Sequence, residues 1–433
     1  MAGRMRNRLM VTLSALGLCL GAAAQTDGTY SGYSPYSVYG IGNLHHNGAA
    51  WQAQMGGVGV ASRTNRYINI QNPASVTARD TLSFMADIGL TGRFSFYSDG
   101  SSRSVSSVVN IDNFVLSFPM WRNTAFMAGI KPYSDMGYKV SYSESGDSST
   151  GTRTFSSSGN GGVYEVFAGA GITLWNRLSL GAQYCLYFGG MNKSASLTFE
   201  DPSFHSMSAG DSLQVKGHTA KFGLQYEQPL SAKRSLVVGA TYKLATPMLG
   251  TAVDFSYKNS MRASRNEKTL GKDIAVRFGS ELGAGISFRE ADRLSVEVDY
   301  TLKDWRSSGL DAVRGFSNSS ASADFSASMG HGVSAGFEFT PARNDIRYFL
   351  RRCTYRAGVY YEQSYYRVGG KSIDAAGLTL GMTLPVFRGY NGLSLGLEAG
   401  QRGFGPGVVR ERYFGFNIGF NVFDIWFQKP RYE

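Results

Sequence analysis

The stretch that decides the fold runs from Thr81 to Leu90 and reads TLSFMADIGL. Apolar side chains occupy every second position of it, namely Leu82, Phe84, Ala86, Ile88 and Leu90. Successive side chains of a β-strand point to opposite faces, so a period of two predicts a strand with one apolar face. Residues 414–422, which read FGFNIGFNV, repeat this pattern near the C-terminus.

The face opposite the apolar one indicates what the strands build. It carries Gly and Ser, together with isolated charges such as Asp87, Lys243 and Glu281. Long charged side chains would crowd the wet face of a soluble sandwich, whereas small residues suit a narrow lumen. The sequence therefore predicts an all-β fold, a transmembrane antiparallel β-barrel whose apolar face contacts lipid. Lys243 and Glu281 are expected to pair inside it.

The number and spacing of the strands support a barrel of the bacterial type. About 14 alternating runs follow one another from Thr81 to the C-terminus, and an even number is usual for such barrels. Short turns alternate with long polar connections, among them residues 143–160 and 246–272, which are expected to be external loops. This rhythm predicts that both chain termini lie in the periplasm.

The composition excludes several other classes of protein. The 433 residues include 54 Gly, 25 Tyr and 27 Phe but only 17% charged residues, and no stretch after Gln25 approaches the ~18 apolar residues of a transmembrane helix. The formal charge of +11 is spread along the chain, whereas a nucleic-acid site would cluster it. No zinc-binding spacing is present, and we expect neither a metal nor a cofactor.

The N-terminus has the pattern of an export signal. Arginines at positions 4, 6 and 8 precede an apolar run from Leu9 to Leu20, and small residues before Gln25 form a cleavage site. We therefore expect a signal peptide at residues 1–24, an N-terminal hatch or plug at 25–80 and the transmembrane barrel at 81–433. The expected location is the outer membrane.

The expected plug contains the motif Asn72-Pro73-Ala74-Ser75. With this motif just before the first strand, the chain resembles the FadL-type outer-membrane transporters of long-chain fatty acids and other hydrophobic compounds. The resemblance implies a 14-stranded barrel, an N-terminal hatch that plugs the lumen, and an Asn-Pro-Ala motif within that hatch. Residues 35–42, 55–60 and 424–432 are similar to a divergent branch of the family. The simpler interpretation of the motif is a turn, in which Pro fixes one dihedral angle and Asn caps the turn.

The third expected strand contains a break. Pro132 cannot donate a ladder hydrogen bond and Gly137 tolerates unusual dihedral angles, so a bulge or gap is expected between them. In the resembled family, a kink at this strand opens the barrel wall and lets apolar ligands leave sideways. The candidate exit residues are Lys131, Pro132, Tyr133, Ser134, Asp135, Met136 and Gly137. The alternative is an ordinary bulge.

The resemblance implies passive uptake of hydrophobic, fatty-acid-like molecules that leave by lateral diffusion into the membrane. The main alternative is a non-transporting barrel that is a subunit of an outer-membrane secretion or assembly complex. An apolar lumen pocket would favour transport, and a lumen packed shut beneath an exposed apolar rim would favour the subunit. The partners expected are outer-membrane lipid, a hydrophobic ligand, the barrel-assembly machinery during biogenesis and, in the second case, complex subunits. No histidine lies in a recognisable catalytic pattern, so we expect no enzyme.

Overall fold

The computed structural model describes residues 32–45, 48–80, 82–100, 102–121, 123–145, 151–201, 203–259, 261–313, 315–316, 325–386, 391–405 and 407–425. The expected signal peptide, residues 1–24, lies outside these ranges. Among the described residues, no helix is long and apolar enough to cross a membrane.

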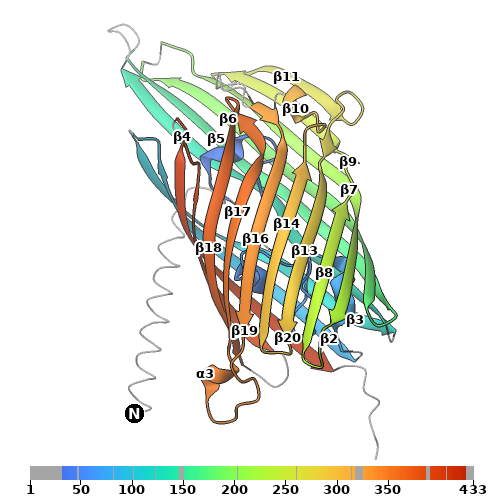
Figure 1. Ribbon diagram of the computed structural model, residues 1–433. Coiled ribbons are helices and arrows are strands. Elements are labelled where there is room, and N and C mark those ends of the chain that lie inside the picture. The colour runs from blue at the N-terminus through green and yellow to red at the C-terminus, as the bar shows by residue number, and fades with distance from the viewer. Residues whose placement is uncertain are drawn as a thin grey trace, which may run out of the picture.

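Antiparallel strands form a closed barrel in which each strand pairs with its neighbours in sequence (Figure 1). The first six are β2 (Ser83–Ser98), β3 (Arg103–Trp121), β4 (Thr124–Ser145), β5 (Thr152–Leu174), β6 (Leu178–Phe199) and β7 (Met207–Pro229). The seventh is interrupted into β8 (Arg234–Lys243), β9 (Thr246–Pro247) and β10 (Leu249–Lys258), and the eighth into β11 (Met261–Leu270), β12 (Arg277–Phe278) and β13 (Ser280–Glu290). The last six are β14 (Leu294–Asp304), β15 (Phe325–Ala327) with β16 (Met329–Phe339), β17 (Thr354–Val368), β18 (Lys371–Pro385), β19 (Gly392–Arg402) and β20 (Arg410–Ile425).

The ring closes where β2 pairs with β20, from Ser83 opposite Ile425 to Ser98 opposite Arg410. Closure leaves the wall without the free edges of an open sheet at this position. The structure thus confirms the predicted antiparallel barrel of fourteen strands.

The two faces of the wall have opposite chemistry. Outward-facing apolar side chains are exposed, with Ile88 at 41%, Val298 at 45% and Leu397 at 50%. Inward-facing Asp87 and Glu297 are buried. A soluble protein would have the reverse arrangement, so the outer surface is one that lipid covers.

Two stretches that were expected to be loops are strands. Residues 246–272 form β9, β10 and β11, and residues 143–160 fall largely in β4 and β5. The prediction was wrong because apolar alternation marks only the part of a strand that contacts lipid. Beyond that part both faces are polar, as in the exposed β11, yet the backbone pairing continues. The long strands β4 to β7 therefore project beyond the others in Figure 1.

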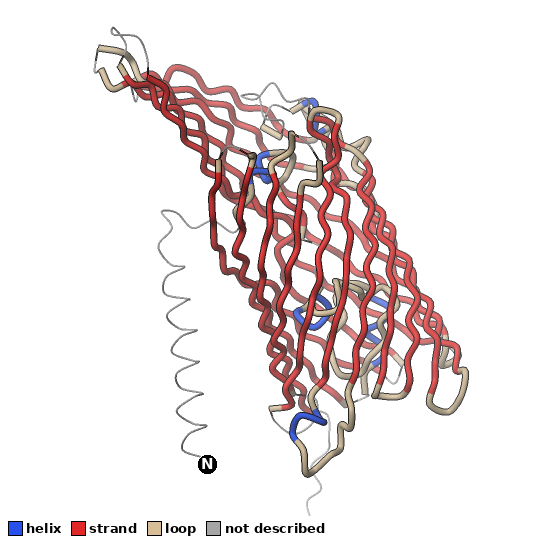
Figure 2. The backbone as a smooth tube through the Cα atoms, turned by 60° about the vertical axis from the view of Figure 1, so that its left-hand side comes forward, coloured by secondary structure: helices blue, strands red, loops and turns tan. Residues whose placement is uncertain are grey.

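Residues 32–45 and 48–80 lie inside the ring of strands, and we call them the inner segment (Figure 2). Its elements are η1 (Pro35–Val38), β1 (Asn43–Leu44), α2 (Ala50–Ala53) and η2 (Pro73–Ala78). Its apolar side chains, such as Ile41, Val58 and Ile68, pack in one cluster with inward-facing wall residues. The lumen therefore holds a packed core.

Two further short elements lie between strands of the wall. The 3-10 helix η3 (Leu310–Ala312) follows β14, and the helical turn α3 (Phe349–Arg352) precedes β17. In Figure 1, α3 hangs from the same end of the barrel at which β2 begins and β20 ends. We call this end the terminal end.

Candidate functional site

The Asn-Pro-Ala-Ser motif begins η2 and fixes it inside the barrel. The side-chain oxygen of Asn72 accepts a hydrogen bond from the backbone N–H of Ala74 at 3.0 Å, so Asn72 is the N-cap, and Pro73 follows at the first helical position. The amide nitrogen of Asn72 donates to the carbonyl of Val60 at 2.7 Å. The Ser75 hydroxyl donates back to the carbonyl of Asn72 at 2.6 Å. The motif thus joins two parts of the inner segment.

Wall glycines make room for this motif. Gly171, Gly181 and Gly223 lie side by side across β5, β6 and β7. A Cβ at Gly223 would lie 2.1 Å from the side-chain oxygen of Asn72, and one at Gly181 would lie 2.3 Å from the carbonyl carbon of Pro73. Only glycine at these positions lets η2 lie directly on the wall. These glycines of the lumen face therefore leave the space that the inner segment occupies.

Two carboxylates on β14 hold a loop of the inner segment. Asp299 accepts hydrogen bonds from the backbone N–H groups of Gly59 and Val60, at 2.6 and 2.8 Å. Glu297 accepts one from Ala61 at 3.0 Å and another from the Ser62 hydroxyl. Both side chains are almost fully buried. Carboxylates that accept several hydrogen bonds make strong anchors, so this loop is fixed to the wall.

A buried ionic cluster forms a third attachment. Glu338 accepts from Arg356 at 2.8 Å and also pairs with Arg66 of the inner segment. Arg356 donates to the side-chain oxygen of Gln54 at 3.0 Å, and its guanidinium lies 4.7 Å from the ring centre of Tyr67. Burial lowers the pKa of Arg66, but the neighbouring negative groups, Glu338 foremost, together outweigh burial and raise the pKa overall. Each charge in this cluster therefore has an ionic partner.

The wall has a seam between β3 and β4. These strands pair only from Trp121 opposite Thr124 to Phe114 opposite Ile130. Beyond this point β3 stays paired with β2, and β4 stays paired with β5. No β3 to β4 pair is present between the described stretches 103–113 and 131–145, so two strand edges separate there.

The inner segment covers the β4 edge of this seam. In β1, Asn43 lies opposite Asp135 and Leu44 opposite Ser134. The backbone N–H of Ser34 donates to the carbonyl of Gly137 at 2.8 Å. The inner segment thus adds a short strand to the edge that β3 leaves open.

An ion pair strengthens this contact. His45 Nε2 lies 2.7 Å from the carboxylate of Asp135. Burial lowers the pKa of His45, but its hydrogen bond to Asp135 and the charge of Asp135 outweigh burial, so the pKa is raised above its ordinary value. The contact with Asp135 therefore favours the protonated, positively charged form of His45.

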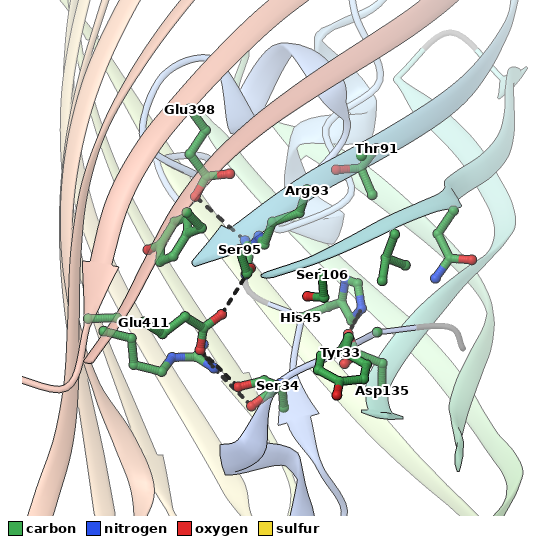
Figure 3. Close-up of a pocket in the computed structure, with 18 of the residues that line it drawn as sticks. Tyr33, Ser34, His45, Thr91, Arg93, Ser95, Ser106, Asp135, Glu398 and Glu411 are labelled. Atoms are coloured by element: carbon green, nitrogen blue, oxygen red, sulfur yellow. Dashed lines mark hydrogen bonds and ion pairs between the residues drawn. The ribbon is translucent and has the colours of Figure 1, made fainter. Parts of the chain in front are cut away.

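A polar cavity of about 110 Å³ lies beside the seam (Figure 3). The Ser34 hydroxyl donates to Glu411 at 2.8 Å, and Arg93 pairs with Glu398 at 3.6 Å. Charged or polar side chains that line the cavity include His45, Arg93, Asp112, Asp135, Glu398, Arg402 and Glu411. Such a lining fits water or a small polar group and not an apolar molecule.

The candidate exit residues do not share one role. Pro132 lies at a register shift in the β4 to β5 ladder, which agrees with the expected bulge. Lys131 pairs with Glu165 at 3.8 Å, and Met136 is buried. Ser134, Asp135 and Gly137 contact the inner segment.

Tyr133 points inward, into an aromatic group. Its ring centre lies 4.7 Å from that of Tyr187, and its hydroxyl accepts from Lys243 at 3.3 Å. Lys243 also pairs with Glu281, which confirms the predicted ion pair. Lys243 therefore links the candidate exit strand β4 to β8 and β13 across the lumen.

The two sequence-predicted sites are separate. Asn72 to Ser75 lie against β5, β6 and β7, whereas residues 131–137 meet the earlier part of the inner segment at the seam. Sequence reasoning missed His45, Glu297 and Glu411, which hold the inner segment to the wall. No local pattern marks them, since their partners lie far away in the chain.

Solved structures resemble this barrel. The Pseudomonas putida toluene transporter TodX is 17% identical, with 89% of this chain and 99% of that chain covered and a TM-score of 0.58. A Pseudomonas aeruginosa FadL homologue is 12% identical, with 88% and 99% covered and a TM-score of 0.57. The Ralstonia pickettii toluene transporter TbuX is 16% identical, with 87% and 98% covered and a TM-score of 0.56. At these identities the likeness establishes the fold alone, that of the FadL-type outer-membrane barrels.

Sequence comparison identifies the family. No curated protein matches the chain. The family model named BamG matches residues 5–433, which is nearly the whole sequence. This chain belongs to the BamG family, and its family fold is an outer-membrane β-barrel of the FadL type.

Proposed function

We propose that this chain is a non-transporting barrel that serves as a membrane-embedded subunit of an outer-membrane barrel-assembly complex. The observation that carries the proposal is the filled lumen. Three buried attachments, from Asn72 to β7, at the Glu297 and Asp299 pair on β14 and at Glu338 on β16, fix the inner segment to the wall. Any passage through the lumen would require these contacts to break together.

The cavities support the same proposal. Pockets for small organic ligands are mostly apolar and usually of about 300–1,000 Å³. The cavity beside the seam is about 110 Å³ and is lined by paired charges, and two others described here are about 20 Å³ each. The family name, BamG, also points to barrel assembly.

The second candidate is a channel for passive uptake of hydrophobic, fatty-acid-like molecules. The seam favours it, because residues 131–137 border an unpaired part of the wall through which an apolar molecule could move sideways into lipid. TodX and TbuX, which have this fold, are toluene transporters. In this case the inner segment near Asn72 to Ser75 would shift during passage.

Both candidates share several proposed features. The signal peptide at residues 1–24 is removed, the inner segment serves as the plug, and both termini face the periplasm. The barrel-assembly machinery inserts the chain during biogenesis, and outer-membrane lipid surrounds it. The chain catalyses no reaction and needs no cofactor.

Native mass spectrometry of the protein, extracted gently from its own membranes, separates the two candidates. The subunit proposal predicts a barrel that arrives with protein partners in fixed ratio and without apolar small molecules. A barrel without partners, carrying fatty-acid-sized molecules, would overturn it in favour of the channel. A sample treated with a harsher detergent, which strips partners, provides the reference mass of the barrel alone.

A further inference from the structure

The connection between β16 and β17 leaves the barrel and ends in α3. We call residues 341–352 the α3 loop. It hangs beyond the wall at the terminal end in both views of the molecule (Figures 1 and 2). Other connections at this end are tight, such as the turn at Asn176 and the turn at Ala291. A longer connection at this position is therefore a distinct feature of the chain.

The α3 loop displays apolar side chains to its surroundings. Ile346 is fully exposed and Leu350 is 64% exposed, while Tyr348 and Phe349 are about half exposed. Four exposed apolar or aromatic residues within five positions are unusual on a wet surface, which indicates that something covers them.

The loop lies on the lipid side of the rim and not beneath the lumen. The hydroxyl of Tyr355 donates to the carbonyl of Leu350 at 3.0 Å. Tyr355 shares its face of β17 with the exposed Val359 and Tyr361, whereas Arg356 points inward and is buried. The apolar side chains of the loop thus continue the outer apolar surface of the barrel.

Arginines alternate with these apolar residues, at positions 343, 347, 351 and 352. Arg351 lies 3.4 Å from Asp345 and Arg343 lies 3.6 Å from Asp292. Among the described residues, Arg347 and Arg352 have no carboxylate within ion-pair distance. The loop therefore carries an excess of positive charge.

The neighbouring rim adds to this charge. The guanidinium of Arg293 lies 5.6 Å from the ring centre of Phe339. Phe339 ends β16 and lies on the same face of that strand as the outward-facing Phe337. The guanidinium of Arg352 likewise lies 5.3 Å from the ring centre of Phe349. Arginines and aromatic rings close together are typical of the boundary between lipid tails and headgroups.

The loop has a fixed shape. Asp345 accepts from the backbone N–H groups of Arg347 and Tyr348, both at 2.8 Å, and these hydrogen bonds hold its pKa below the ordinary value. The N–H of Ala342 donates to the carbonyl of Arg351 at 2.8 Å and closes the loop. Its surface is therefore preorganised for contact.

We propose that the α3 loop is an interfacial anchor that binds the headgroups of anionic phospholipids at the terminal end of the barrel. Ile346, Phe349 and Leu350 enter the headgroup boundary, and Arg347 and Arg352 donate to lipid phosphates. On the proposed orientation this is the periplasmic leaflet. The inference does not depend on whether the barrel is a subunit or a channel.

The test uses the full mature chain in nanodiscs with a fluorescent bimane label at Ile346→Cys. Cys185 and Cys353 are buried and stay unlabelled. Lipids brominated on the acyl chain quench the label on contact, and two nanodisc sets carry the bromine on either phosphatidylglycerol or phosphatidylcholine. We expect stronger quenching by phosphatidylglycerol than by phosphatidylcholine. The preference for phosphatidylglycerol should fall about fivefold in Arg347→Gln and about fivefold in Arg352→Gln.

The matched control is Arg262→Gln with Arg265→Gln, which removes two exposed arginines from β11 at the other end and should leave the preference unchanged. The β-strand signal in far-ultraviolet circular dichroism checks that every variant is a folded barrel. Equal quenching by both lipids would overturn the headgroup proposal. Quenching by neither lipid would also overturn it. If the label at position 346 were then shielded from solvent in native membranes, the loop would be assigned to an acidic protein partner.

Discussion

The inner segment is attached to the wall in two different ways. Around Asn72, Asp299 and Glu338 it is held by hydrogen bonds and ion pairs that reach the strands β7, β14 and β16. At the seam it is held by the short β1 strand and by the His45 to Asp135 pair, whose side chains are 20% and 14% exposed. The first region therefore fixes the inner segment, whereas the second, with fewer and more exposed contacts, is where the segment separates from the wall most readily.

The largest effect is expected from Glu338→Gln. This change leaves Arg66 and Arg356 buried without a carboxylate, and breaking a buried pair costs about 3–5 kcal/mol of unfolding free energy. Chemical denaturation of the purified barrel in detergent measures it. Glu144→Gln removes the partner of Arg153 in an exposed pair and should cost less than about 1 kcal/mol. Equal effects for both variants would contradict the central role of the ionic cluster.

Asp299→Ala should have the next largest effect. It leaves the N–H groups of Gly59 and Val60 without their acceptor, at a cost of about 3 kcal/mol for the two groups. Hydrogen exchange at residues 59–62 should speed up while exchange in the wall stays slow. Asp304→Ala, on the same strand but paired with the exposed Arg306, is the control and should leave residues 59–62 unchanged. Unchanged exchange in Asp299→Ala would show that the carboxylates do not anchor the loop.

Gly223→Ala tests the contact between η2 and the wall. The added methyl group would meet the side-chain oxygen of Asn72 at 2.1 Å, so η2 must move, at a cost of about 2 kcal/mol. Gly190→Ala is the matched control, because its nearest neighbour is a backbone oxygen at 3.7 Å. Thermal unfolding midpoints of the two variants should differ, with Gly223→Ala the lower. Equal midpoints would mean that η2 does not press on these strands.

The smallest effect is expected at the seam and depends on pH. Because the pKa of His45 is raised in the folded protein, the stabilisation from its pair with Asp135 is complete below the ordinary pKa of histidine and is lost as pH rises through the raised value. The thermal midpoint of the wild type should exceed that of His45→Gln at acidic pH, and the gap should narrow as pH increases. A gap that widens with pH would reverse the assigned sign.

Much of the fold was predictable from the sequence, because lipid imposes a period of two on each strand that contacts it. The stretch from Thr81 to Leu90 and the run at 414–422 show this pattern, and their strands β2 and β20 close the barrel. The polar extensions of β10 and β11 escaped prediction because water on both faces removes the alternation.

The candidate site was predictable only in part. Pro132 disrupts a ladder for a local reason, so its bulge could be expected from the residue type alone. The partners of Asn72, Asp135 and Glu297 follow from how the inner segment lies in the lumen, and no periodicity encodes that path. The pairing of Lys243 with Glu281 was predictable because both lie on the lumen face of consecutive hairpin strands.

Equilibrium binding of a fluorescent fatty acid to the purified barrel tests the central claim, that the filled lumen has no room for an apolar ligand. The measurement compares the wild type with Asp299→Ala, in which the inner segment is partly released. A filled lumen gives no saturable binding to the wild type. Saturable binding of one molecule per barrel, weakened by rebuilding residues 131–137 as regular strand, would show that the lumen admits an apolar ligand and would favour the channel.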